Sequence, residues 1–117
     1  NIIRMTRITK GPKVASYIKG VINLRGEVIP VLSLRLKMYL PDDEITQKSR
    51  IIILRTEQQG MIGFIVDEVR EVVTLEADQI SKPSSSTSDT DTEHFISGVG
   101  QYNNALVSIL SLSAITE

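Results

Sequence analysis

The 117-residue sequence predicts an all-β fold made of many short strands. Its hydrophobic runs are short and rich in β-branched residues, which is typical of strands. Glycine, asparagine and proline separate these runs at positions where tight turns form. Pro30 lies inside one run and cannot donate to a strand ladder, so it marks an edge, a bulge or a bend. These features favour a small curved barrel, or a pair of barrels, over a flat sheet.

The first predicted hairpin has the clearest signal. Residues 21–24 and 28–34 form two mostly buried strands around the turn Arg25-Gly26-Glu27. Gly26 is the natural residue for a positive φ in such a turn. A last hairpin, residues 96–102 and 105–112, turns at Asn103-Asn104, since asparagine also tolerates a positive φ.

The other expected elements follow the same signals of apolar runs and turn residues. In chain order they are extended chain at 2–8, a turn and one helical turn within 12–18, a short turn at 34–40, an exposed loop at 41–49, strands at 50–55 and 61–69 joined by a turn at 57–60, extended chain at 72–75, and a mobile surface loop at 81–93.

A faint internal repeat links the first and last hairpins. Residues 18–34 and 96–112 each run Ile-x-Gly-Val, a strand, a turn, and a strand that ends in hydrophobic-Ser-Leu. Two similar subdomains that share one core would explain this repeat.

Composition excludes several classes of function. With 13 basic and 14 acidic residues, the chain has no net field that would attract nucleic acid or an anionic membrane. The absence of cysteine removes disulfides and zinc-thiolate sites and fits a reducing compartment. No apolar run approaches the roughly 20 residues that span a bilayer. We therefore expect a soluble, cytoplasmic protein without membrane insertion.

No group of residues supports catalysis, a cofactor or a metal. Asp67 and Glu68 are adjacent at a strand end and point to opposite faces, which is poor geometry for a carboxylate pair. The acidic residues of 89–93 lack the spacing of a calcium loop. His94 is the only histidine and has no rigid nucleophile near it in sequence. The glycines at 98–100 lack the strand, turn and helix that hold phosphates.

Two features remain as candidates for binding. Arg25 is a permanent cation at the tip of an apolar hairpin, and is either a solvated turn residue or an interface anchor. Residues 69–73 carry more apolar side chains than one core face needs. Burial on both sides is the expected explanation, and contact with a partner is the alternative.

Three ordered blocks of sequence resemble the signature of the CheW family, the coupling proteins of bacterial chemotaxis. They are YIKGVINLRGEVIPVLSLR at residues 17–35, GFIVDEVREV at 63–72 and FISGVG at 95–100. The resemblance covers nearly the whole chain and implies a single CheW-like domain over residues 1–117. It also implies two small SH3-like five-stranded barrels around a shared hydrophobic core.

The resemblance further implies a non-catalytic adaptor. Members of this family bridge the cytoplasmic tips of methyl-accepting chemoreceptors to the regulatory domain of the histidine kinase CheA. Arg25 and Gly26 match the family's Asn-Leu-Arg-Gly turn, near the groove where the receptor docks. Gly63, Val69 and Val72 fall on family positions implicated in the same region. An apolar groove of this kind receives one face of a helix.

The chain departs from the family pattern at three places. Ser33 and Ser111 stand where an aspartate is common, so any hydrogen bonding by that carboxylate is weakened or replaced. Asn1 stands where a glutamate, a plausible partner of Arg25, is common. The family also has further strands before this point. Their absence predicts an incomplete first barrel with an open edge, and hence a dimer, a domain swap or support from another chain.

Two other functions are kept as alternatives. The chain could be a CheW-like regulatory domain of a larger protein of the CheA or CheV type, although its end soon after the last strand slightly favours a separate protein. A small-ligand or nucleic-acid-binding barrel is disfavoured, because three Tyr, two Phe and no Trp offer few stacking platforms.

Overall fold

The computed structural model describes residues 1–11, 15–82 and 94–117. It divides into two compact units, unit 1 (Asn1–Arg70) and unit 2 (Glu71–Glu117). Strands form most of the regular structure in both units, which confirms the predicted all-β class. Most of the loop expected at 81–93, and part of the turn expected at 12–18, lie outside the described residues.

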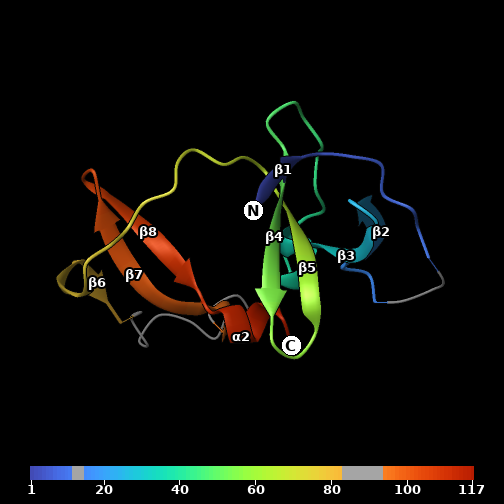
Figure 1. Ribbon diagram of the computed structural model, residues 1–117. Coiled ribbons are helices and arrows are strands. Elements are labelled where there is room, and N and C mark those ends of the chain that lie inside the picture. The colour runs from blue at the N-terminus through green and yellow to red at the C-terminus, as the bar shows by residue number, and fades with distance from the viewer. Residues whose placement is uncertain (12–14, 83–93) are drawn as a thin grey trace. The chain divides into compact units, whose positions relative to one another are not determined.

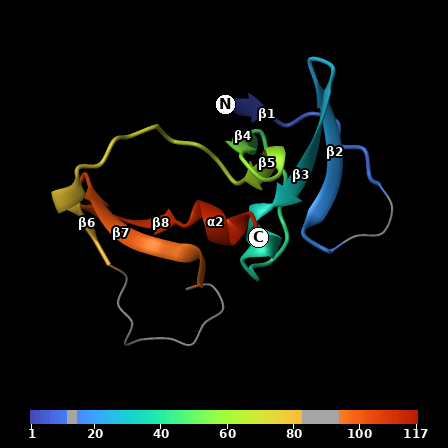
Figure 2. The ribbon, with the colours of Figure 1, turned by 60° about the horizontal axis from the view of Figure 1, so that its bottom comes forward.

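Unit 1 is built on a five-stranded sheet in the order β1-β4-β5-β3-β2. Its strands are β1 (Ile2–Arg4), β2 (Ile18–Leu24), β3 (Glu27–Ser33), β4 (Arg50–Thr56) and β5 (Gly60–Val66). Neighbouring strands are antiparallel except β3 and β5, which are parallel and pair from Val31 opposite Gly63 onward. Figure 1 shows β4 and β5 side by side, and Figure 2 shows the long β2–β3 hairpin.

Pro30 lies in β3, which has a strand on each side, so an edge strand is excluded among the three alternatives of an edge, a bulge or a bend. Pro30 pairs with Val21 of β2. In a hairpin with a two-residue turn, amides alternate between pointing at the partner strand and away from it, and position 30 points away from β2. Pairing with β5 starts only at Val31. The missing amide of Pro30 therefore removes no ladder hydrogen bond.

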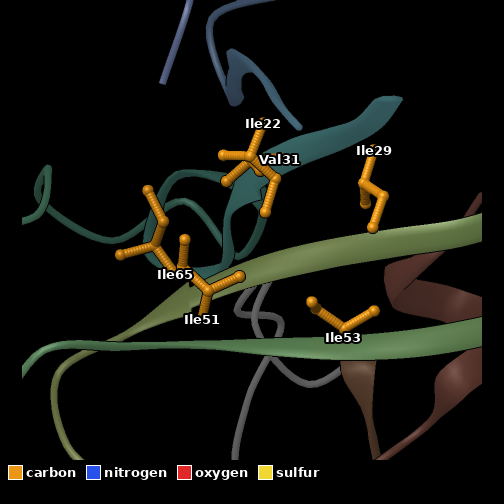
Figure 3. Close-up of a cluster of buried hydrophobic side chains, with 6 residues drawn as sticks. All are labelled: Ile22, Ile29, Val31, Ile51, Ile53 and Ile65. Carbon is orange, nitrogen blue, oxygen red and sulfur yellow. The ribbon is translucent and has the colours of Figure 1, made fainter. Parts of the chain in front are cut away.

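The core of unit 1 is a cluster of aliphatic side chains from four strands. Figure 3 shows them pointing toward one another from β2, β3, β4 and β5. They are Ile22, Ile29, Val31, Ile51, Ile53 and Ile65, and each is at most 3% exposed. Burial of one such side chain contributes about 1.5–3 kcal/mol, so this cluster is the main source of stability in unit 1.

Unit 2 contains a three-stranded sheet in the order β6-β7-β8. Its strands are β6 (Ile80–Ser81), β7 (Ile96–Tyr102) and β8 (Ala105–Leu110). Within the described ranges, the sheet of unit 1 thus has five strands and that of unit 2 has three. The smaller sheet belongs to the second half of the chain and not to the first, where the incomplete barrel was expected.

The internal repeat is visible in the backbone hydrogen bonds of both units. Each hairpin has a register shift in its first strand, at Ile18/Gly20 and at Ile96/Gly98. Ser33 N donates to Tyr17 O and Ser111 N donates to Phe95 O, both at 2.7 Å. The same local sequence pattern therefore produces the same local structure twice.

A short helix follows each hairpin, and serine starts both. The helices are α1 (Leu34–Lys37) and α2 (Leu112–Ile115). Ser33 Oγ accepts from Leu36 N at 3.1 Å, and Ser111 Oγ accepts from Ala114 N at 3.3 Å. Serine is a good N-cap because its oxygen satisfies an amide that the helix leaves free. The hydroxyls thus supply the hydrogen bonds expected of the replaced carboxylates.

Candidate partner-binding surface

The turn between β2 and β3 places Arg25 on the surface of unit 1. Arg25 and Gly26 have φ values of 53° and 85°, so both central residues of this two-residue turn are left-handed. Asn23 Oδ1 accepts a hydrogen bond from the Gly26 amide at 3.1 Å, which stabilises the turn. The Arg25 side chain is exposed and has no hydrogen bond or ion pair with any residue in the described ranges. The turn therefore presents an unpaired cation to the solvent.

The matching turn of unit 2 shows that arginine is not the easiest residue for this conformation. There Asn103 and Asn104 have φ values of 50° and 62°. A left-handed φ costs most residues roughly 1–2 kcal/mol, and asparagine is an exception because its side chain bonds locally. Arg25 thus occupies a position where asparagine would be conformationally cheaper.

Val28 adds an apolar side chain beside this turn. It lies opposite Asn23 in the β2–β3 ladder and is 67% exposed. The sequence predicted residues 28–34 to be mostly buried, and Val28 departs from this because alternate side chains of a strand point to opposite faces. Since Ile29 and Val31 face the core, Val28 faces away from it. The alternation of side chains along the strand could therefore have predicted the exposure of Val28 from the sequence.

Gly63 lies in the interior of unit 1 and not on its surface. It is a buried residue of β5 opposite Val31 of β3. A Cβ atom at this position would lie 2.9 Å from Ile51 Cγ2 and 3.5 Å from Val31 Cγ2. The glycine therefore permits close packing of the core, and any effect on a partner would act through the position of β5.

Residues 69–73 are not buried on both sides, so that expectation is wrong. β5 ends at Val66, and no strand is formed at 72–75. Val69 is half-buried, whereas Val72 is 84% exposed. Val69 belongs to unit 1 and Val72 to unit 2. The exposure of Val72 leaves the alternative that part of this segment contacts a partner.

Charged residues that follow β5 form ion pairs at the surface of unit 1. Arg35 donates two hydrogen bonds to the Asp67 carboxylate, at 2.8 and 2.7 Å. These bonds lower the pKa of Asp67 below its ordinary value, against a smaller opposing effect of desolvation. Glu68 instead pairs with Arg70 at 3.2 Å and Lys48 at 3.8 Å. The adjacent carboxylates thus have separate cations and do not form an acid–base pair.

The described residues were also searched for a metal site and a membrane span, and the surroundings of His94 were inspected. Over the ranges that the structure describes, no three or more His, Cys, Asp or Glu residues are grouped so that they could hold a metal ion. Among the same residues, no helix is both long and apolar enough to cross a membrane. His94 is exposed, and its Nε2 lies 3.2 Å from Glu117 Oε1.

The fold identifies this chain as an all-β protein of two SH3-like subdomains. The chain belongs to the CheW-like domain family, whose family model matches residues 1–117. This confirms the family resemblance that the three sequence blocks indicated.

Relatives and a solved structure agree with this assignment. The chain is 38% identical to the chemotaxis protein CheW of Bacillus subtilis over 118 residues, which cover 100% of this chain and 74% of the relative. It is 32% identical to the chemotaxis protein CheW of Helicobacter pylori, with 97% and 67% covered. The scaffolding protein TtCheW from Thermoanaerobacter tengcongensis matches with a TM-score of 0.82 and 32% identity, over 96% of this chain and 75% of that one.

Proposed function

We propose that this protein is a non-catalytic chemotaxis adaptor that couples methyl-accepting chemoreceptors to the histidine kinase CheA in the cytoplasm. The observation that carries the proposal is the match over the whole chain to the chemotaxis protein CheW of Bacillus subtilis at 38% identity. The similarity to a scaffolding protein of known structure supports a binding role. An adaptor needs surfaces for two partners and no reacting groups.

The receptor-binding surface in this proposal includes the turn Arg25-Gly26. Strained residues cluster at functional sites, where a side chain is needed despite its conformational cost. Arg25 fits this rule, because its left-handed φ would suit asparagine better and its guanidinium has no partner in the described chain. A guanidinium at an interface can bond a carboxylate or a carbonyl of the partner through several donors.

Apolar side chains would supply the rest of the receptor contact. Val72 and Val28 are exposed, and Val69 is half-buried. Apolar anchors of this kind fit one face of an amphipathic helix. Gly63 is assigned to the same region, with an indirect role through β5. The receptor tip is helical in this proposal, so it would present such a face.

A binding experiment with a charge-matched control tests the receptor surface. Arg25→Asn removes the cation and keeps a residue suited to the turn, and Arg25→Glu reverses the charge. Both variants should bind a purified receptor tip more weakly than the wild type. Arg7→Asn makes the same charge change at another exposed arginine with no described partner and should bind normally. Unchanged binding by Arg25→Glu would remove the turn from the proposed site.

Binding to the kinase is measured separately, with the CheA regulatory domain in place of the receptor tip. Wild-type protein should bind both partners, and Arg25→Asn should retain the kinase. If the wild type binds neither, the adaptor proposal fails as a whole. If Arg25→Asn loses both, the turn affects the fold or a shared surface instead of receptor binding alone.

A second candidate is a CheW-like domain within a larger chemotaxis protein. The chain is 26% identical over 117 residues to the chemotaxis protein CheV3 of Helicobacter pylori and covers 38% of it. The complete reading frame decides between the two, since a receiver or kinase domain in the same frame would identify the larger protein. Self-association of the chain also stays a prediction, for which sedimentation over micromolar concentrations is the test.

A further inference from the structure

Two arginines lie directly opposite each other at one end of the sheet of unit 1. Arg4, the last residue of β1, pairs with Arg50, the first residue of β4. Figure 1 shows β1 beside the start of β4, at the end where the loop of residues 41–49 enters this strand. Side chains of directly opposed residues lie on the same face, and like charges in such a pair destabilise a sheet. A bound anion would remove this electrostatic cost.

Neither arginine has a carboxylate partner in the described chain. Arg35 of the same unit, by contrast, donates two hydrogen bonds to Asp67. Arg4 is exposed and makes no hydrogen bond or ion pair with the described residues. Arg50 Nη1 donates to two backbone carbonyls, both at 2.8 Å, which holds the guanidinium in place but does not neutralise its charge. Two positive charges therefore remain together at this end of the sheet.

A cavity of about 430 Å³ adjoins the arginine pair. Its lining residues are Arg4, Met5, Thr46, Gln47, Ser49 and Arg50. None of them is acidic, so no charge in the cavity wall opposes an anion.

Two hydroxyl groups add donors to this cavity. Thr46 Oγ1 accepts from the Lys48 amide at 3.1 Å, and Ser49 Oγ accepts from the Thr46 amide at 2.9 Å. Because each oxygen accepts from a backbone amide, its own proton stays available to a ligand. Ser49 is only 2% exposed, so its position is set by the packing of the fold. The cavity thus combines two guanidinium groups with neutral donors.

We propose that this cavity binds the phosphoryl group of a small phosphate ester. A phosphate monoester carries about −1.5 to −2 charge at pH 7, which matches two guanidinium groups, whereas one carboxylate would neutralise only one of them. Arginine can bond a phosphate through two parallel N–H donors. Small-molecule sites span roughly 300–1,000 Å³, and a cavity in this range has room for the organic part of the ester as well as its phosphate.

Titration of the 117-residue chain with inorganic phosphate and with glycerol phosphate tests the site. The ionic strength is held constant, because added salt alone screens exposed charges. Amide signals of Arg4 and of residues 46–50 should shift with both probes and reach saturation. Acetate at the same concentrations is the carboxylate control and should bind more weakly.

A pair of glutamine variants shows whether the arginine pair is responsible. Arg4→Gln removes one charge without removing any described hydrogen bond, and should raise the dissociation constant for phosphate about tenfold or more. Arg7→Gln makes the same change at an exposed arginine that does not line the cavity, and should bind as the wild type does. Arg50→Gln should also weaken binding, but Arg50 holds the loop as well, so Arg4→Gln is the cleaner test.

Urea unfolding gives a second measurement of the same pair. In phosphate-free buffer of low ionic strength, Arg4→Gln should have a higher urea midpoint than the wild type, because it removes the repulsion between opposed charges. Added phosphate should raise the midpoint of the wild type more than that of the variant, since a ligand stabilises the folded state that binds it.

Each contrary result has a definite meaning. Shifts without saturation, or equal binding by wild type and Arg4→Gln, would indicate an adventitious ion only and would overturn the proposal. Binding of inorganic phosphate without glycerol phosphate would indicate a site for the free anion, and equally tight binding of acetate would indicate a carboxylate site. Either result would overturn the assignment to a phosphate ester. None of these measurements depends on receptor or kinase binding.

Discussion

The hairpin β2–β3 with α1 and the hairpin β7–β8 with α2 share one backbone plan but differ in burial. Both have a turn with two left-handed residues, a register shift in the first strand and a serine cap. In unit 1, Ile29 is 1% exposed, whereas its counterpart Val107 is 40% exposed. The difference arises because Ile29 packs in the buried cluster formed by side chains of β2, β3, β4 and β5, whereas Val107 lies outside the buried core.

This comparison separates local from long-range effects. Turn residues, bulges and caps recur in both units because each depends on a few adjacent residues. Burial does not recur, since it depends on strands that are distant in sequence. Substitutions at equivalent positions should therefore have unequal effects where packing decides and similar effects where local conformation decides.

The largest difference is expected for the core positions. Ile29→Ala should destabilise unit 1 by about 3 kcal/mol, because it leaves a cavity among buried side chains. Val107→Ala should cost less than about 1 kcal/mol, since its side chain is already half in water. Urea unfolding followed by amide signals in each unit measures both values.

The same experiment also tests the prediction of a single domain over residues 1–117, because independent units would unfold at different urea concentrations.

The serine caps should differ by a smaller amount. Ser33 is fully buried and, besides capping α1, donates to Asp43 Oδ2. The other oxygen, Oδ1, is buried without a partner in the described chain. Ser33→Ala should cost about 2 kcal/mol, since it removes a cap and a donor to a carboxylate. Ser111→Ala should cost about 1 kcal/mol for the cap alone. Equal losses in urea unfolding would show that the Asp43 contact contributes nothing.

The two turns should respond in opposite directions. Arg25→Asn should stabilise unit 1 by up to about 1 kcal/mol, because asparagine adopts a left-handed φ more readily. Asn103→Ala should destabilise unit 2 by a similar amount, about 1 kcal/mol. Thermal unfolding measures both. A variant at Arg25 that gains stability while it loses receptor binding would separate the function of this residue from its structural cost.

Much of the fold could be predicted from the sequence, for reasons that the two hairpins illustrate. The sequence predicts the turns at Gly26 and Asn103, and also the repeat, because these features depend on neighbouring residues. It does not predict the parallel pairing of Val31 with Gly63, since this pairing joins segments separated by a loop and another strand. For the same reason the sequence left an edge, a bulge and a bend open at Pro30, and only the structure excludes the edge.

The candidate site was less predictable than the fold. Arg25 could be found from the turn pattern, and its exposure follows from its place at a hairpin tip. Val72 was expected to be buried, because its apolar neighbours suggested a core strand, yet β5 ends before it. The bond from Ser33 to Asp43 also had no sequence signal, since it joins a strand end to a loop.

The smallest effect concerns the Arg35–Asp67 pair, which has no counterpart in unit 2 because the equivalent of Arg35 is Ser113. The hydrogen bonds from Arg35 lower the pKa of Asp67 in the folded state. The pair therefore adds stability above the unfolded pKa of about 3.9, and this contribution is lost as the pH falls through the lower folded pKa. The side chains of Arg35 and Asp67 are 35% and 58% exposed, so solvent screens the pair and the effect is small.

Asp67→Asn should therefore lower the urea midpoint of unit 1 slightly at pH 7, and the difference from wild type should shrink below pH of about 4. Unit 2 amides should show the same change as those of unit 1 where the chain unfolds as a single domain, and no change where the two units unfold independently. A difference that grows as the pH falls would mean that folding raises the pKa of Asp67. This result would contradict the lowered pKa that the Arg35 bonds are expected to cause.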